Sequence, residues 1–310
     1  MGLMLNSKTV GGAAFKSSSI AGMILGGKVI WQSVPPFSVA WTITGSWNAT
    51  GIKSVGDNIY VVASDDDSLI SYDSTGAVVW KWSSGQSGYK IYLATDSNQQ
   101  FYVLSYDSTN WFIKIIDKNG NALSEFNISD RPYYMDADNS NVYIATSTGV
   151  EKLDDTGAQV WKWTSSATQS VTVDSEGNVY AGGSAGVTKL DSSGNQLWQW
   201  QSSGVIASVA VDSDGNVYSG GWDNCITKLD SSGKQVWQCS SSNAIYFLTT
   251  DSEGNVYAVD SSGYVIKFSS GKQVWQWKGS ASANKVAVDS NFNVYVGCSN
   301  GNITKLAQTK

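Results

Sequence analysis

The sequence predicts an all-β fold: a seven-bladed β-propeller closed by a strand from near the N-terminus and preceded by a short β-strand arm. Three observations lead to this fold class: a tyrosine that recurs along the chain, a repeated Asp/Gly turn, and a tryptophan-bearing strand displaced to the other end of the sequence. The tyrosine follows Val, Ile or Phe and recurs at steps of 37 to 42 residues. Seven copies of about four short strands each are the signature of a propeller. The tyrosines are Tyr60, Tyr102, Tyr143, Tyr180, Tyr218, Tyr257 and Tyr295.

One repeat, residues 209–238, shows how a blade is built. Two turns in it, Asp212 to Asn216 and Asp230 to Lys234, both place Asp first and Gly fourth. This pattern is typical of a hairpin loop in which Asp caps a type I turn and Gly adopts the left-handed conformation. Apolar alternation in the flanking runs marks four strands with one buried face each. A single unit of this size cannot bury its own surface, so it must stack against copies of itself.

The tryptophan of the fourth strand also recurs, and it shows how the ring closes. It is missing only from the second copy, where Asn121 to Phe126 replaces it. The last copy ends after its third strand, and Trp41 precedes Trp80 by 39 residues, which is one period. The strand that contains Trp41 therefore completes the last blade, and closure removes the exposed edges of an open array. The recurring residues are Trp80, Trp161, Trp198, Trp237 and Trp275.

Repeats that end in Leu-Asp-x-x-Gly-x-x-x-Trp, such as residues 190–198 and 229–237, resemble the PQQ-like β-propeller repeat family. The resemblance covers about residues 38–310 and implies that the tryptophan docks each blade on the next. The quinoprotein dehydrogenases of that family imply a bound cofactor, calcium, a catalytic aspartate and a vicinal disulfide. None of these can be identified here, because no two of the three cysteines are adjacent and the chain is too short for the larger ring. No cofactor is expected.

Composition excludes several classes of function. The net charge is −6 without a basic stripe, which argues against nucleic acid as a partner. The chain has no histidine, the commonest general base and zinc ligand. No run is long and apolar enough to span a membrane, and no secretory signal is recognised. The Asp turns superficially resemble a calcium loop but lack its downstream Glu, so no metal is expected.

The three cysteines do not form a disulfide framework. If Asp230 and Lys234 close their hairpin, Cys225 and Cys239 face each other across two strands. We interpret them as small, reduced, space-filling residues, and a cross-strand disulfide is the alternative.

Residues 1–36 form a separate segment, predicted to be a β arm and linker that precedes the propeller of residues 37–310. Leu5–Val10, Phe15–Ile20 and Leu25–Ile30 align at steps of ten residues. The segment resembles the short repeats that open tail, baseplate and other virion proteins of bacteriophages infecting Gram-positive bacteria, which implies attachment to other virion proteins. It could also pair with copies of itself, or simply brace the propeller. A virion location is expected, with synthesis in the host cytoplasm; a cytoplasmic or cell-surface location is the alternative.

The candidate ligand residues lie in the connections that differ between repeats. The uniform Asp turns occupy one face of the disc, so the second-to-third strand loops and the links between blades occupy the other, where binding residues concentrate. Aromatic rings beside carboxylates and amides are typical of a sugar-binding surface. The candidates are Trp47, Asn48, Asp65, Asp66, Tyr89, Trp111, Tyr133, Trp222, Asp223 and Asn224.

These observations favour a non-enzymatic virion protein that displays its variable face to a host-surface glycan. The alternative is a bacterial PQQ-like scaffold that binds other proteins. A glycosidase that uses Asp65, Asp66 or Asp223 as acid and base is a third interpretation, although no catalytic pair stands out.

Overall fold

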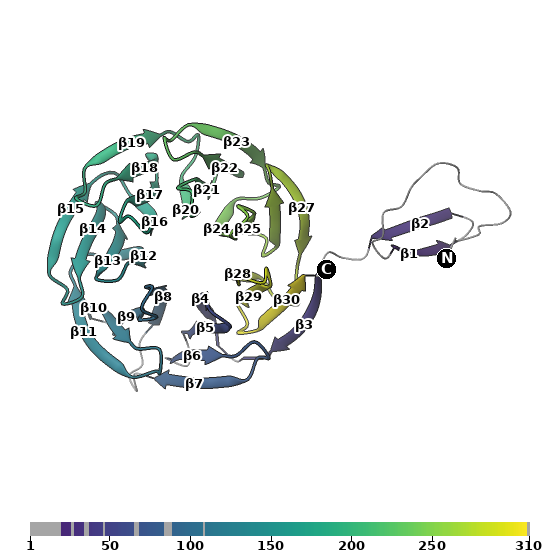
Figure 1. Cartoon of the computed structure of the whole chain (residues 1–310), viewed down its shortest axis with the longest axis horizontal. Helices are drawn as coiled ribbons and strands as arrows, with labels where there is room; N and C mark the ends of the chain where they lie inside the picture. The colour runs from purple at the N-terminus through teal and green to yellow at the C-terminus, as the bar shows by residue number, and fades with distance from the viewer. Residues whose placement is uncertain are drawn as a thin grey trace.

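The computed structural model describes residues 20–25, 28–33, 37–45, 47–64, 68–83, 89–107 and 109–308, with side chains from residue 37 onward except for residues 89–91. The described residues from Phe37 onward form seven four-stranded antiparallel sheets, arranged as a ring around a central channel (Figure 1). No long apolar helix of the kind that crosses a membrane occurs in these residues. The predicted seven-bladed propeller is therefore confirmed.

Each blade has an innermost strand A, followed outward by strands B, C and D. The A strands are β4 (Ala49–Val55), β8 (Tyr89–Thr95), β12 (Pro132–Ala137), β16 (Thr168–Val173), β20 (Ile206–Val211), β24 (Ile245–Thr250) and β28 (Ala283–Val288). The B strands are β5 (Asn58–Ala63), β9 (Phe101–Tyr106), β13 (Asn141–Thr146), β17 (Val179–Gly183), β21 (Val217–Gly221), β25 (Val256–Asp260) and β29 (Val294–Cys298). We number the blades I to VII in the order of these A strands.

The outer half of each blade completes the sheet. The C strands are β6 (Ser68–Tyr72), β10 (Trp111–Ile116), β14 (Gly149–Asp154), β18 (Gly186–Leu190), β22 (Cys225–Leu229), β26 (Val265–Ser269) and β30 (Ile303–Gln308). The D strands of blades I to VI are β7 (Val78–Ser83), β11 (Ala122–Ile128), β15 (Gln159–Thr164), β19 (Gln196–Trp200), β23 (Gln235–Ser240) and β27 (Lys272–Trp277).

Blade VII is closed by both ends of the chain. Its D strand is β3 (Phe37–Ile43), which pairs antiparallel with β30, so that Trp41 lies opposite Lys305. The closing strand predicted from the position of Trp41 is confirmed. It begins at Phe37, one residue before the matched segment.

The A–B turns of blades II to VII are held by their aspartates. In blade V, Asp212 Oδ1 accepts hydrogen bonds from the backbone N–H groups of Asp214 and Asn216, at 3.0 and 2.9 Å. Gly215 has a φ of 75°, in the left-handed region that favours glycine. The second carboxylate oxygen accepts the hydroxyl of Tyr218 at 2.9 Å, which satisfies this buried side chain. The turn aspartate and the recurring tyrosine thus form one structural unit.

The D-strand tryptophan joins each blade to the next. Trp198 of blade IV donates its Nε1–H to the carbonyl of Ser231 in blade V at 3.1 Å, and its ring lies under Gly233. Trp41, Trp80 and Trp161 make the same hydrogen bond to Ser74, Lys118 and Ser192. In blade II, Phe126 takes the place of the tryptophan against Gly157.

The D strands also contain a bulge, and it changes the predicted cysteine register. Leu229 pairs with Gln235, but Lys228 pairs with Trp237, so Val236 is bulged out of the ladder. Beyond the bulge Cys225 pairs with Ser240, and Cys239 pairs with Ile226. The prediction that the two cysteines face each other was wrong by one residue, and all three thiols are free.

The N-terminal segment is described only in part. β1 (Ile20–Leu25) and β2 (Lys28–Ser33) form a two-stranded hairpin that is a sheet of its own (Figure 1). Residues 1–19, which contain two of the three expected repeats almost entirely, lie outside the described residues. The division into residues 1–36 and 37–310 stays a prediction.

Candidate functional site

Every A strand has a bulge near its first residue, at the end that faces the variable connections. In blade III, for example, Pro132 pairs with Thr146 and Tyr134 with Ala145, which leaves Tyr133 without a partner in the ladder. Bulges often change the direction of side chains next to functional sites. Seven bulges at equivalent positions place one ring of residues around the channel mouth: Thr50, Ile91, Tyr133, Gln169, Ala207, Tyr246 and Asn284.

A cavity of about 270 Å³ lies at this mouth. Blades II to VII all contribute to its walls, so it is centred on the channel and does not lie between two blades. Its outer part contains four of the bulge residues and the exposed ring of Trp222, and its inner part contains four residues that directly follow a bulge. The lining residues are Tyr92, Tyr133, Tyr134, Gln169, Ala207, Trp222, Tyr246, Phe247 and Lys285.

The inner part of the cavity is an aromatic cage around one amine. Lys285 Nζ lies 4.3 Å from the ring centroid of Phe247, 5.4 Å from Tyr134 and 5.5 Å from Tyr92. The rings of Tyr92 and Tyr134 meet edge to face, with centroids 5.1 Å apart. Ring faces attract a cation, and the attraction is strongest where water is excluded. The cage therefore compensates part of the cost of burying the ammonium group.

Burial in this cage lowers the pKa of Lys285 from 10.5 to about 8, and the nearby charge of Lys53 acts in the same direction. Lys53 itself lies 3.8 Å from Asp136 Oδ1. Asp136 Oδ2 also accepts the hydroxyl of Thr172 at 2.8 Å and the backbone N–H of Val173 at 3.2 Å. The carboxylate of Asp136 thus already has partners in blades I and IV. Within the described residues, Lys285 has no carboxylate partner.

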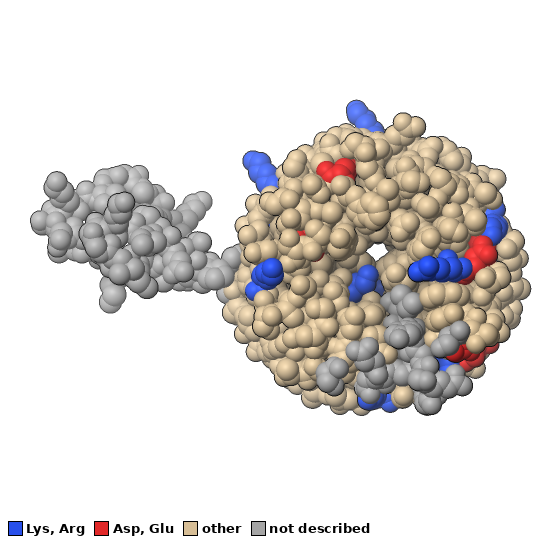
Figure 2. All heavy atoms as spheres, turned by 180° about the vertical axis from the view of Figure 1, so that it is seen from behind, with Lys and Arg blue, Asp and Glu red and all other residues tan. Residues whose placement is uncertain are grey.

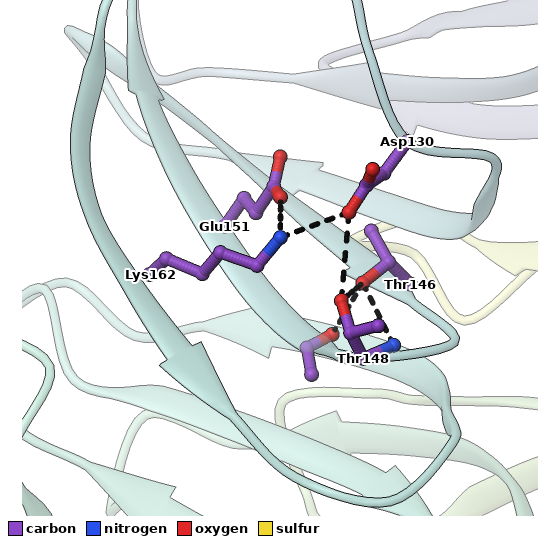
Figure 3. Close-up of polar contacts among 6 residues, drawn as sticks. Asp130, Thr146, Thr148, Glu151 and Lys162 are labelled. Carbon is purple, nitrogen blue, oxygen red and sulfur yellow. Dashed lines mark hydrogen bonds and ion pairs between the residues drawn. The ribbon is translucent and has the colours of Figure 1, made fainter.

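A charged network supports the connection that leads to Tyr133 (Figure 3). Lys162 Nζ donates to Asp130 Oδ2 at 2.9 Å and to Glu151 Oε1 at 2.5 Å, and Glu151 is almost fully buried. Thr148 donates to the same oxygen of Asp130 at 3.4 Å. The hydrogen bond from Lys162 lowers the pKa of Asp130. Because Asp130 lies in the link between blades II and III, the network holds the segment that leads to Tyr133.

The loop of Trp222, Asp223 and Asn224 is held rigidly, with its indole ring turned outward. Asp223 accepts the backbone N–H of Cys225 at 3.1 Å and the hydroxyl of Ser202 at 2.8 Å. Asn224 has a φ of 57° and completes the turn. Trp222 is 60% exposed at the cavity mouth. The side chain of Asp223 and the backbone of Asn224 therefore support the loop, and the ring of Trp222 stays exposed at the cavity mouth.

The prediction that Trp47 is exposed was wrong. Only 9% of this residue is accessible, and it packs in the core between blades VII and I. The glycines at positions 45 and 301 allow this close approach, since a β-carbon on either would lie within 3 Å of Trp47 atoms. Asn48 accepts a side-chain hydrogen bond from Asn284 at 2.7 Å and its carbonyl accepts the N–H of Ser64, so it links the blades.

The remaining candidates lie elsewhere. Trp111 stacks on Tyr106 across the β9–β10 hairpin, with ring centroids 4.5 Å apart, and is outside the cavity. Asp65 and Asp66, as well as the side chain of Tyr89, lie outside the described residues. Of the ten candidates, the structure thus brings together Tyr133 and Trp222 at one cavity.

The A–B turns form an acidic row on one face of the ring. They carry no Lys or Arg, and their acidic residues line two hollows on the turn face, together with Lys152 and Lys189 of the C strands. Figure 2 shows the opposite face, on which basic atoms lie beside the central opening. The acidic turn residues are Asp57, Asp96, Asp138, Asp174, Glu176, Asp212, Asp214, Asp251, Glu253 and Asp289.

Comparisons with known proteins establish the family. A family model described as outer membrane protein assembly factor BamB matches residues 18–130, 145–244 and 184–309, which together make up more than half of the chain. The chain belongs to this family of PQQ-like propellers. No curated protein sequence matches it. Among solved structures, the WD40 β-propeller domain of Doa1 is similar, with a TM-score of 0.74 over 88% of this chain and 97% of that one, at 14% identity. The latter likeness concerns the fold alone.

In this PQQ-like propeller the repeat motif explains the blades and their joints, whereas the cavity residues depart from the repeat. Equivalent positions after the bulge hold Gly51, Ser170 and Ser208 in three blades. The hydroxyls of Ser170 and Ser208 accept backbone N–H groups of the following blade, at 3.2 and 3.1 Å. Large side chains occupy this position only in blades II, III, VI and VII, and these four form the cage.

Replacing Lys285 with methionine is expected to stabilise this PQQ-like propeller at neutral pH. The unfolded chain keeps the Lys285 proton up to a pH of about 10.5, but the folded chain releases it near pH 8, so the contribution of Lys285 to stability should rise with pH between these values. The variant lacks this dependence and should be more stable at pH 7 by about 1–3 kcal/mol. Urea titrations at pH 7 and pH 10 measure the difference. If the unfolding free energies of wild type and Lys285→Met change equally between pH 7 and pH 10, the result would contradict the burial of a charged amine.

Proposed function

We propose that this chain is a non-enzymatic binding protein, a virion component that presents the variable face of its propeller to a glycan on the host-cell surface. The observation that carries the glycan part of the proposal is the group of aromatic rings at the channel mouth. Trp222 and Tyr246 are 60% and 54% exposed, although side chains of this size are usually buried. Together with Tyr133 they line the same cavity. Sugar rings stack on such surfaces through their apolar C–H faces.

The polar groups at this face support binding more readily than acid and base catalysis. Asp223 and Asp130 are both engaged in hydrogen bonds that hold their own loops. A glycosidase requires two carboxyl groups on opposite sides of one sugar bond. Among the cavity-lining residues there is no carboxylate. The chain also lacks histidine.

The virion part of the proposal depends on the N-terminal segment. Its repeats resemble those of phage tail and baseplate proteins, and the β1–β2 hairpin pairs only with itself in the described residues. An isolated two-stranded hairpin is marginal in water, so it needs a further surface for stability. We propose that other virion proteins provide this surface. Many copies on one particle would then multiply weak binding at each site.

The glycan proposal predicts that a Trp222→Ala/Tyr246→Ala double variant binds cell-wall polysaccharide of Gram-positive bacteria about 10-fold more weakly than wild type. Each stacked ring contributes about 0.5–1.5 kcal/mol, and 1.4 kcal/mol corresponds to a tenfold change in affinity. Isothermal titration with purified polysaccharide measures this change. Trp111→Ala is the matched control, because Trp111 stacks on Tyr106 on the same face but outside the cavity. Equal binding by all three proteins would contradict the proposal.

A scaffold for protein–protein interaction is the second candidate. It is favoured by membership in a family whose model is described as an outer membrane protein assembly factor. Exposed Trp and Tyr residues are also typical anchors of protein interfaces. Under this alternative the same double variant would lose a protein partner in crosslinking experiments and would show no change with polysaccharide.

A further inference from the structure

The cavity at the channel mouth contains a positive charge with no counter-ion among the described residues. Lys285 Nζ has three N–H donors, and within the part of the chain that the structure describes it makes no hydrogen bond and no ion pair to the protein. Its neighbours are the rings of Phe247, Tyr134 and Tyr92. A ring face attracts the charge but does not accept hydrogen bonds as an oxygen does. The amine is therefore available to an anionic group that enters the cavity.

We propose that the cavity binds an acidic glycan and that the carboxylate or phosphate group of this glycan pairs with Lys285. This inference rests on the proposed glycan-binding function and specifies its substrate class. The walls of the cavity do not repel an anion, because none of the lining residues carries a negative charge. Charge-assisted hydrogen bonds are about twice as strong as neutral ones. In a site lined by apolar rings, such a pair also selects against neutral sugars.

The dimensions of the cavity limit what enters. Its volume of about 270 Å³ is near the lower end of the range for small-ligand sites. It can hold one sugar residue or one charged end group, whereas the rest of the chain would lie across Trp222 and Tyr246 at the mouth. Gln169 also lines the cavity and can bind a sugar hydroxyl.

Binding should depend on pH, because the amine loses its charge within an accessible range. The other charged or titratable groups near the cage are Lys53 and Asp136, which pair with each other, and the phenols of Tyr92 and Tyr134, whose pKa values are raised by burial. Arg131 lies 5.9 Å from the ring centroid of Tyr133, and its charge also acts on Tyr92, but it stays charged throughout this pH range. Tyr133 and Tyr246 lie at the mouth. In the free protein the pKa of Lys285 is about 8. An anion that pairs with it favours the charged form, so affinity should decrease as the pH rises above this value.

The test uses the full-length protein and four probes: trigalacturonic acid, its methyl ester, glucose 1-phosphate and glucose. Titration calorimetry at pH 7 should show that trigalacturonic acid, glucose 1-phosphate or both bind at least 10-fold more tightly than their neutral counterparts. The stronger of the two identifies the anionic group. Lys285→Met should remove this preference, and Lys285→Arg should retain the charge and the preference at pH 7 and pH 9.5. Wild type should lose about 10-fold in affinity between these pH values.

Lys278→Met is the matched control, because Lys278 directly follows the D strand of blade VI and its amine contacts Tyr264, outside the cavity. It should bind the anionic probes like wild type. Equal binding of each acid and its neutral counterpart, or no binding of either acid at millimolar concentration, would overturn the inference. If the Trp222→Ala/Tyr246→Ala variant weakens polysaccharide binding while Lys285→Met does not, the proposed function stands and only the acidic specificity fails. If neither variant changes binding, both fail.

Discussion

Removal of residues 1–43 is expected to open the ring and lower the unfolding free energy by at least about 5 kcal/mol. β3 is the D strand of blade VII, and without it β30 becomes an unprotected edge. The joint to blade I would also lose the hydrogen bond from Trp41 to Ser74 and the contact of the Trp41 ring with Gly76. Loss of one large buried aromatic side chain alone costs about 3–5 kcal/mol. Thermal unfolding and analytical size-exclusion chromatography measure stability and self-association through the exposed edge.

Removal of residues 1–36 is the matched control, since it leaves β3 intact from Phe37. This shorter truncation should keep the melting temperature of the ring and should remain monomeric. If residues 1–36 provide the attachment, the truncated chain should also be absent from purified virions. A ring that unfolds after this truncation would show that the arm is part of the propeller core.

Replacing Trp198 with alanine is expected to destabilise the propeller by about 3–5 kcal/mol. The change leaves a cavity between blades IV and V, next to the ring of Tyr180, and removes the hydrogen bond to Ser231. Trp222→Ala removes an equally large side chain from an exposed loop and should cost less than about 1 kcal/mol. Denaturant titration of both variants measures the contrast. Comparable losses would mean that the indole ring of Trp198 does not join the blades.

Gly233→Ala tests the same joint from its other side. The φ of Gly233 is 86°, and a β-carbon there would lie 2.7 Å from the ring of Trp198. Combined with Trp198→Ala, the glycine substitution should cost less than it does alone, because the clash with the ring has been removed. If the losses of unfolding free energy from the two substitutions are strictly additive, Gly233 and Trp198 are not in contact.

Most of the fold could be predicted from the repeated residues, because these residues close the turns and join the blades. The period of the tyrosines located every B strand, since each of these side chains fills the same buried position. The displaced Trp41 located the closing strand. The cysteine register failed because it assumed a regular ladder between Asp230 and Cys225. The bulged residue, Val236, resembles any other strand residue in the sequence, so the shift by one position could not be seen.

The candidate site was predicted only in part, for a physical reason. The position of Trp222 and Tyr133 in variable connections predicted them as site residues. Such a position does not distinguish an aromatic ring that projects from the surface from one that packs into the core. Trp47 folds back because two glycines leave it room. The cage of Lys285 was missed because Tyr92, Tyr134 and Phe247 lie in alternating strands, where aromatic residues predict core. The available signal was the departure from the repeat, namely a lysine where blades IV and V have serine.

The acidic A–B turns have a consequence for how the molecule approaches other surfaces. The carboxylates of these turns lie on one face of the ring, and Lys285 lies at the opening of the other. An anionic surface repels the carboxylates and attracts the amine, so these groups favour an approach with the channel mouth forward. Salt confines this orientation to within about 10 Å of the surface at an ionic strength of 0.1 M. The turns that stabilise each blade would thus also orient the whole ring during its last approach.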